Sequence, residues 1–250
     1  MAASGRTLVF GGRGLVGAAI CRELSRRGVL PVASVGRSEG VGGGGPVCAS
    51  VEQVHGVDAL NAEACQNLFV GDVRAVVISM GLPPWIIDRE KAVRANGLTN
   101  VSVLKMASEH KVKRIILLNA TMPTWSLISS YREGKEMAEA EALKYAESCG
   151  PDCGVLILKP SLVSGTRYVG SVPLPLWLAF SPLRLFFRVF ATPCQALEKT
   201  FPSLLGGCLR PAAHVEEIAA AAVDAIVDPN IRGVKVLSPE DLVGYKSKVE

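Results

Sequence analysis

Tyr131 and Lys135 are the side chains whose types and spacing best fit catalysis. They stand four residues apart in the segment 130–135, SYREGK, so one helical turn places both on the same face. There the ammonium group can lower the phenol pKa from about 10. Tyr131 would then exchange a proton with a substrate oxygen while a hydride moves. The alternative is that Tyr131 is an ordinary aromatic residue at a helix start and Lys135 a solvated base.

A glycine-rich turn near the start of the chain has the spacing of a phosphate-binding loop. The segment 9–17, VFGGRGLVG, fits Gly-x-Gly-x-x-Gly from Gly12 and Gly-x-x-Gly-x-x-Gly from Gly11. Such a turn needs a tight bend, a backbone bare enough for a diphosphate, and a following helix whose N-terminus supplies free N–H groups. We expect the dinucleotide to contact Gly11, Gly12, Arg13, Gly14, Leu15, Val16 and Gly17.

The end of the second predicted strand distinguishes the two dinucleotides. An acid there would bind the ribose 2′-hydroxyl of NAD(H), but residues 35–38 are VGRS. The guanidinium of Arg37, with Ser38 beside it, suits a 2′-phosphate through charged hydrogen bonds. The sequence therefore favours NADP(H) as the cofactor and leaves NAD(H) as the second choice. Alternatively, Arg37 is a solvated base in a glycine-rich loop.

Around these residues, short apolar runs alternate with helical periodicity, which predicts a Rossmann-type, doubly wound parallel sheet of the α/β class. The chain of 250 residues is expected to form a single domain. Strands are expected at Thr7 to Phe10, Val29 to Val35, Ala75 to Ser79, Arg114 to Leu118 and Val155 to Leu158. Helices are expected at about 15–27, 88–110 and 132–147, each with one apolar face.

After about residue 160 the composition changes to that of a small, basic and apolar lobe. Residues 153–215 contain six bases and a single acid, Glu198. We expect residues 161–212 to form this C-terminal lobe, and about 5–160 and 213–240 to form the Rossmann core. A helix at Val215 to Val227 and a last strand near Val234 to Leu237 return the chain to the core.

The run 181–190, SPLRLFFRVF, admits several interpretations. Ser181 as a cap and Pro182 at the first helical position predict a helix start, with Arg184 and Arg188 on one face. The segment can be a lid over a hydrophobic, quinone-like substrate, or an interfacial segment on anionic lipid. It can also be a surface buried by a partner subunit, or core packing from which the arginine side chains extend to water.

Bulk properties exclude several classes. A formal net charge of +4 without a run of Lys and Arg argues against nucleic acid, and no apolar stretch is long enough to span a membrane. The early first strand leaves no room for a secretory signal or a long basic presequence, so any organelle address is expected to be short, internal or absent. The seven cysteines lack metal or disulfide spacing, so no metal is expected and Cys149 and Cys153 are expected to be free thiols. Gly40 to Gly45 is expected to be a solvated loop, and the alternative is that it lies over a cofactor.

Five further segments carry a family resemblance. They are Val57-Asp58, Ser79-Met80-Gly81, Arg94-Ala95-Asn96-Gly97, Lys159-Pro160-Ser161 and His214-Val215-Glu216-Glu217-Ile218-Ala219. In this order they resemble short-chain dehydrogenases/reductases of the extended or atypical kind, over nearly the whole chain. Beyond the glycine turn, the resemblance implies cofactor contacts from Asp58, Ala59, Ser79, Met80, Gly81, Asn96, Lys135, Lys159 and Pro160.

The catalytic residues match this family only in part. Tyr131 and Lys135 have the family's Tyr-x-x-x-Lys spacing, but Asn119 stands closest to the position where the family presents Ser or Thr. An amide can donate a hydrogen bond to a carbonyl, but it cannot relay a proton as a hydroxyl does. Thr121 can replace it if the loop is bent. Whether the protein turns over a substrate is therefore left open, whereas cofactor binding is still expected.

Within the superfamily, the short lobe and the run Leu209-Arg210-Pro211 are most similar to mitochondrial dehydrogenase-like proteins associated with coenzyme Q (ubiquinone) biosynthesis. The dehydrogenase-like accessory subunit of respiratory complex I resembles the chain in the same way. Both resemblances imply a mitochondrial protein on the matrix side of the inner membrane, often inside a larger assembly. One hypothesis is an NADP(H)-dependent oxidoreductase that supports coenzyme Q biosynthesis. The other is a non-catalytic subunit that uses bound dinucleotide for stability.

Overall fold

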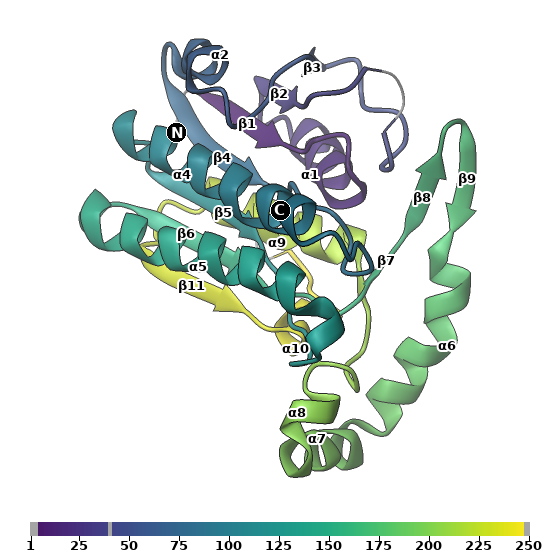
Figure 1. Cartoon of the computed structure of the whole chain (residues 1–250). Helices are drawn as coiled ribbons and strands as arrows, with labels where there is room; N and C mark the ends of the chain where they lie inside the picture. The colour runs from purple at the N-terminus through teal and green to yellow at the C-terminus, as the bar shows by residue number, and fades with distance from the viewer. Residues whose placement is uncertain (1–4, 40–41, 248–250) are drawn as a thin grey trace.

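The computed structural model describes residues 5–39 and 42–247 and has a seven-stranded parallel sheet at its centre (Figure 1). Its strand order is β11-β6-β5-β4-β1-β2-β3. The strands are β1 (Arg6–Phe10), β2 (Val32–Val35), β3 (Val51–Val54), β4 (Val73–Ile78), β5 (Arg114–Leu118), β6 (Gly154–Leu158) and β11 (Gly233–Leu237). The predicted doubly wound α/β fold is confirmed, since helices cover both faces of this sheet.

Successive side chains of each strand enter different hydrophobic layers. Val9 belongs to the cluster that includes Ile20 and Ile218, whereas Phe10 belongs to the cluster that includes Leu104. This alternation follows from the two-residue period of a strand. The first layer lies under α1 (Leu15–Arg26) and α9 (Val215–Val227), and the second under α4 (Thr99–Glu109) and α5 (Ser129–Cys149). Shorter helices are α2 (Ala62–Gln66), α3 (Arg89–Val93) and α10 (Pro239–Leu242), with 3-10 turns at Asn67–Phe69 and Ser126–Ile128.

The chain reverses its direction of winding between β1 and β4. Phe10 and Ile78 are register partners at the ends of these two strands, so the loops that follow them leave the sheet side by side. The N–H of Ser79 donates to the Phe10 carbonyl at 2.9 Å. In doubly wound sheets a crevice opens at such a reversal, outside the carboxyl ends of the strands.

The helix expected at 88–110 is interrupted by a π-helical turn, Arg94–Leu98, between α3 and α4. Within this turn Asn96 donates from Nδ2 to the Ala92 carbonyl at 3.0 Å. A Cβ on Gly97 would lie 3.0 Å from the Cα of Gly134, so the turn approaches α5 at backbone distance. Such turns place one extra residue in a helix and re-aim its side chains.

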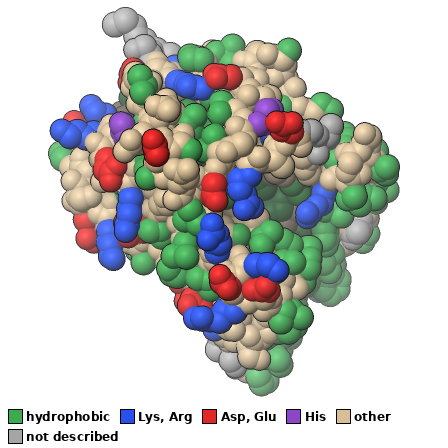
Figure 2. Space-filling view, turned by 45° about the horizontal axis from the view of Figure 1, so that its top comes forward, with side chains coloured by type: hydrophobic (Ala, Val, Ile, Leu, Met, Phe, Trp, Pro, Cys, Tyr) green, Lys and Arg blue, Asp and Glu red, His purple; other side chains and the backbone are tan. Residues whose placement is uncertain are grey.

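Residues 166–205 form an arm beside the sheet, here called the apolar arm. It contains a hairpin, β8 (Thr166–Val169) with β9 (Val172–Pro175), followed by α6 (Leu176–Val189), α7 (Ala191–Thr200) and α8 (Pro202–Leu205). The short parallel pair β7 (Val163–Ser164) and β10 (Ala213–His214) flanks it on both sides in sequence. Figure 1 shows the hairpin and α6 standing away from the sheet, and the same right-hand rim carries many hydrophobic side chains in Figure 2. No helix in the described part of the chain is long and apolar enough to cross a bilayer.

Two sequence expectations are wrong in this part of the chain. The helix predicted to start at Ser181 begins at Leu176, and Pro182 lies inside it. Proline has no N–H, so Pro182 cannot donate to the carbonyl four residues earlier, that of Leu178. The helix tolerates this loss because Leu178 is exposed. Cys149 and Cys153 form a disulfide rather than staying free. The chain turns back at Gly150, which has a φ of 92° at the end of α5 and brings the two Cα atoms to 5.9 Å.

Candidate functional site

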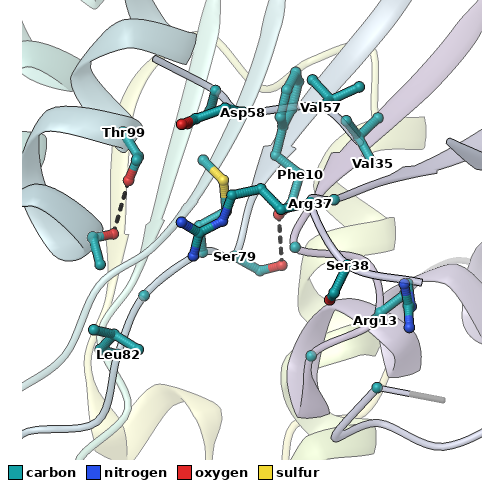
Figure 3. Close-up of a pocket in the computed structure, with 18 of the residues that line it drawn as sticks. Phe10, Arg13, Val35, Arg37, Ser38, Val57, Asp58, Ser79, Leu82 and Thr99 are labelled. Carbon is teal, nitrogen blue, oxygen red and sulfur yellow. Dashed lines mark hydrogen bonds between the residues drawn. The ribbon is translucent and has the colours of Figure 1, made fainter. Parts of the chain in front are cut away.

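A cleft of about 600 Å³ lies at the carboxyl ends of β1, β2 and β4 (Figure 3). Its walls are the glycine turn, the ends of β2 and β4, and the helix that follows β4. Many of the residues predicted to bind the cofactor meet here. Those that line the cleft are Gly11, Arg13, Gly14, Arg37, Ser38, Asp58, Ala59, Ser79, Met80 and Gly81.

The glycines of the turn are required for two different reasons. A Cβ on Gly12 would lie 2.5 Å from Ser34 Oγ, and one on Gly17 would lie 2.3 Å from the Gly11 carbonyl oxygen. Those two glycines let the turn pack against the sheet. Within the described part of the chain, a Cβ on Gly14 would have only the Gly11 oxygen near it, at 3.2 Å. The protein's own packing therefore does not account for a bare backbone at Gly14, and the cleft lies on that side.

Gly14 also forms the N-cap of α1 without a side-chain hydrogen bond, and the first turn of α1 has no acidic residue. Among the described residues, the N–H groups at the start of this twelve-residue helix therefore have no side-chain acceptor. Free N–H groups and the positive end of the helix dipole favour an anion at this position. These N–H groups lie where the sequence predicts a diphosphate, and its binding there stays a prediction.

The other residues predicted for the cofactor lie behind or beside the cleft. Leu15, Val16 and Gly17 belong to the first turn of α1 and pack towards the core. Asn96 is fully buried and accepts from the Leu82 N–H at 3.1 Å, so it holds the loop after β4 rather than the cleft itself. Lys135, Lys159 and Pro160 are placed next to the loops after β4 and β5.

Three arginines surround the adenosine end of the cleft. Arg13 is buried, with Nη1 3.3 Å from His55 Nδ1, and Arg94 lies 3.5 Å from Asp58. Arg37 is exposed and makes no ion pair within the described residues. Figure 3 shows its side chain extending into the space between Asp58 and Ser79. Arg37 is thus a free cation in the cleft, as its proposed 2′-phosphate role requires.

The sequence alone did not single out one wall of the cleft. Lys91, Arg94 and Ala95 line it from the helix after β4. Their spacing of three and four residues places them on one helical face, and that pattern is the signal that could have identified them. The π-helical turn at Arg94–Leu98 changes the helical phase, so the face they share is decided by the fold.

The glycine loop after β2 is packed rather than solvated, which corrects the sequence expectation. The Gly44 N–H donates to the Arg13 carbonyl at 3.0 Å, and Arg22 donates to the Gly44 carbonyl at 2.8 Å. A Cβ on Gly44 would lie 2.3 Å from Ala18 Cβ. The loop therefore lies directly on the glycine turn and α1, where side chains have no room. Gly40 and the residue after it lie outside the described residues.

Tyr131 and Lys135 meet at the start of α5, beside the loop that follows β4. Lys135 Nζ donates to the Leu118 carbonyl at 2.9 Å and lies 5.9 Å from the centre of the Tyr131 ring. A Cβ on Gly81 would be 3.6 Å from the same Nζ. Gly81 lines the cleft, so the ammonium of Lys135 lies just behind its inner end. Neither Lys135 nor Tyr131 is among the described residues that line the cleft itself.

Burial dominates the protonation of this pair. Burial lowers the pKa of Lys135 from 10.5 to about 8 and raises the pKa of Tyr131 from 10.0 to about 12. The lowering of the phenol pKa expected from the neighbouring ammonium is therefore not what this structure gives, because desolvation of the phenolate is the larger effect. At neutral pH Tyr131 is a protonated donor, which suits protonation of a substrate oxygen.

Asn119 and Thr121 belong to a second, polar pocket of about 230 Å³ next to Lys135. Asn119 is buried and donates to Glu139 at 2.6 Å, and its oxygen accepts from the Ala120 N–H at 2.9 Å. Glu139 also pairs with Lys159 at 2.6 Å, and Thr121 donates to the Lys159 carbonyl at 3.0 Å. The Asn119 amide is thus engaged in joining β5 to α5.

The parallel sheet, the crevice at its reversal point and the bare glycine turn define a Rossmann-type nucleotide-binding fold. The sequence profile of the NAD dependent epimerase/dehydratase family matches residues 7–175, which is more than half of the chain. The protein belongs to this family. An uncharacterized, chloroplastic protein of Arabidopsis thaliana is 31% identical over 239 residues, which cover 92% of this chain and 74% of the relative.

Solved structures of similar fold support the architecture. The Bordetella bronchiseptica enzyme WbmF, in complex with NADH, superposes with a TM-score of 0.64 at 18% identity, covering 97% of this chain and 76% of that one. A UDP-glucuronic acid 4-epimerase from Bacillus cereus, in complex with NAD, gives a TM-score of 0.61 at 16% identity, covering 93% and 76%. At these identities the likeness establishes the fold.

Gly14→Ala tests whether the bare backbone at the turn is needed for a ligand. We expect the variant to fold with a Tm close to that of the wild type, because the added Cβ meets only one protein atom, at 3.2 Å. Its affinity for dinucleotide should fall by about tenfold or more, the equivalent of one charged hydrogen bond. Calorimetric titration measures this. Unchanged affinity would remove the diphosphate from this turn.

Lys135→Met tests the buried ammonium through stability. The pKa of Lys135, lowered to about 8, means that the unfolded chain binds the proton more tightly than the folded one. The charged lysine therefore destabilises the fold most below pH 8, and this cost disappears as the pH rises towards 10.5. The Tm difference, variant minus wild type, should be most positive at pH 7 and decline above pH 8. Lys105→Met, at an exposed site on α4, is the control; a difference independent of pH would contradict the prediction.

Proposed function

We propose that this protein binds NADP(H) in the cleft and transfers a hydride and a proton between the cofactor and a carbonyl or hydroxyl group of its substrate. The observation that carries the proposal is the continuity of the cleft. It runs from the free cation Arg37, past the uncapped start of α1, to Gly81, next to Lys135 Nζ. The solved neighbours that contain NAD or NADH support dinucleotide binding.

The residues present fit such a cofactor. Gly14 has no side chain beside the cleft, and the first N–H groups of α1 have no side-chain acceptor in residues 5–39 and 42–247. The diphosphate would therefore bind there. Asp58 and Ala59 would lie along the adenosine, and Arg37 with Ser38 would take the 2′-phosphate. The neighbours named above contain the non-phosphorylated cofactor, so the preference for NADP(H) rests on Arg37 and on the missing acid at this strand end.

The chemistry follows from the protonation states at the inner end of the cleft. The nicotinamide supplies or accepts the hydride when it is bound. In the reducing direction Tyr131 donates its phenolic proton to the carbonyl oxygen as the hydride reaches the carbonyl carbon, giving an alcohol. Lys135 then stabilises the phenolate until a proton from solvent restores it, and it can hold the nicotinamide ribose. The reverse direction returns the proton to Tyr131.

The proposed cellular role is support of coenzyme Q biosynthesis in mitochondria. It rests on the resemblance of the short lobe and of the run 209–211 to mitochondrial dehydrogenase-like proteins. The Arabidopsis relative is designated chloroplastic, so a chloroplast is the competing compartment. Fractionation of cells that express the chain at its native level distinguishes the two: recovery with mitochondria supports the proposal, and recovery with chloroplasts overturns it.

A non-catalytic role is favoured by one observation. The Asn119 amide already has hydrogen-bond partners in Glu139 and the Ala120 N–H. It is therefore less available to hydrogen-bond a substrate than a free serine hydroxyl would be. In this second candidate function the bound dinucleotide stabilises an accessory subunit of a mitochondrial inner-membrane complex such as respiratory complex I. Native purification decides between the two. A stoichiometric large assembly with nucleotide that never changes redox state supports the accessory role, and turnover by the isolated chain rejects it.

Arg37→Ala tests the choice of dinucleotide. We expect the affinity for NADPH to fall by about tenfold or more, because a charged hydrogen-bond pair to the 2′-phosphate is lost. The affinity for NADH, which lacks that phosphate, should stay within a factor of about two. Titration of both nucleotides against wild type and variant measures the split. Equal losses for the two would show that Arg37 does not read the 2′ position.

Tyr131→Phe tests the proton transfer. Removal of the phenolic hydroxyl should lower turnover by roughly 10²–10⁴-fold, the usual contribution of a positioned acid or base. NADPH binding should be unchanged, since the ring is retained. Consumption of NADPH with a short-chain ubiquinone as the probe gives the rate. Tyr168→Phe, at the hairpin strand β8, is the matched control, and full activity in Tyr131→Phe would remove this residue from the mechanism.

A further inference from the structure

We propose that the apolar arm docks on the surface of an anionic lipid membrane. The arm collects much of the molecule's exposed hydrophobic surface. Among the described residues, thirteen of the twenty-four exposed large hydrophobic side chains lie between residues 169 and 204. A soluble chain normally scatters such residues singly, and a contiguous patch marks an interaction surface.

Helix α6 shows why this surface needs a covering. One stripe of the helix, at Leu176, Phe180 and Phe187, is buried or half-buried against the protein. The opposite side is apolar too: Leu185 is 64% exposed and Val189 is 67% exposed. A helix that is hydrophobic all round is ordinarily buried on all sides. Here the protein covers one side, and the outer side is left for an external apolar medium.

The charges of the arm match an anionic surface. Glu198 is the sole acid between residues 169 and 204, and it is buried and paired with Arg210 at 3.0 Å. Arg184 is also used internally, in a pair with Glu217 at 2.5 Å. Arg188 and Lys199 remain exposed and make no ion pair with any described residue. The arm thus presents apolar side chains and cations to solvent, the combination that binds anionic lipid interfaces.

The hairpin extends the same surface. Val169 and Val172 flank its tight turn and are 60% and 61% exposed. Figure 2 shows hydrophobic side chains along the right-hand rim, where Figure 1 places β8, β9 and α6. A hairpin tip of this kind can enter the acyl region without burying an unpaired charge. The docked face therefore includes both the hairpin and α6.

Other occupants fit these observations less well. No residue between 169 and 204 lines the dinucleotide cleft, so the exposed face is not a lid over that cleft. A symmetric contact between two copies would bury the same patch of both subunits, so Arg188 and Lys199 of both copies would enter one interface. Like charges oppose such a contact. An anionic lipid surface supplies negatively charged headgroups for the cations and an acyl region for the apolar side chains. It does not require a fixed pattern of hydrogen bonds.

Vesicle co-sedimentation of the full chain tests the proposal. The wild type should sediment with phosphatidylcholine vesicles that contain phosphatidylglycerol and should stay in solution with pure phosphatidylcholine. Binding should weaken at high salt, because the cations act through screened charge. Failure to sediment with either vesicle would overturn the proposal. The measurement needs no nucleotide, so its failure is distinct from failure of the proposed chemistry.

Matched variants assign the binding to the arm. The double variant Leu185→Ser/Val189→Ser should lose at least about tenfold in affinity for the anionic vesicles. Its Tm should be unchanged, because both side chains are exposed. Val70→Ser, at a position 75% exposed outside the arm, should bind like the wild type. Arg188→Glu should weaken binding by about fivefold or more, and Lys105→Glu on α4 is its control. Equal binding by the arm variants and their controls would overturn the assignment.

Oligomeric state supplies an independent readout. Light scattering of the wild type in the absence of vesicles should give the mass of a monomer. A stable dimer that the double variant abolishes would assign the arm to contact between copies and overturn the lipid proposal. A stoichiometric protein partner that is lost in the same variant, together with no vesicle binding, would overturn it as well.

Discussion

The structure depends on the close approach of two backbones at the carboxyl edge of the sheet. The Ser79 N–H donates to the Phe10 carbonyl, and a Cβ on Gly11 would lie 2.9 Å from the Ser79 backbone. This contact between the loops after β1 and β4 leaves no space for a side chain at position 11. It places the start of α1 and the loop after β4 on opposite sides of one crevice. The candidate cofactor residues line this crevice or lie directly behind its walls.

At the inner end of the crevice, burial determines the chemistry more than the neighbouring charges do. Lys135 donates a hydrogen bond to the Leu118 carbonyl while being almost excluded from water. Desolvation brings the lysine pKa close to neutrality and keeps the Tyr131 pKa high. The pair is therefore organised as a neutral phenol beside an ammonium that titrates near physiological pH. A solvated lysine with the same spacing would stay charged well above physiological pH.

The apolar arm is connected to the cofactor region through the backbone. The Tyr168 N–H, in β8, donates to the Gly43 carbonyl at 2.9 Å, and the next residue of that loop, Gly44, donates to Arg13 in the glycine turn. In its middle the arm is held by the pair of Arg184, in α6, with Glu217 at the start of α9. The arm thus has a defined orientation relative to the cleft, although its outer side packs against none of the described protein.

Local sequence patterns were enough to predict the alternation of strands and helices, the glycine turn and the helical alignment of Tyr131 with Lys135. These features depend on backbone preferences and side-chain periodicity within short windows. The missing acid after β2 likewise made Arg37 identifiable from the sequence. The disulfide between Cys149 and Cys153 depends on the local turn at Gly150. The tertiary structure alone decided that Gly44 packs on the glycine turn and that Lys91 and Arg94 form a wall of the cleft. It also decided which residues of the arm remain exposed, because burial and pairing depend on contacts between segments far apart in the chain, which a local pattern does not encode.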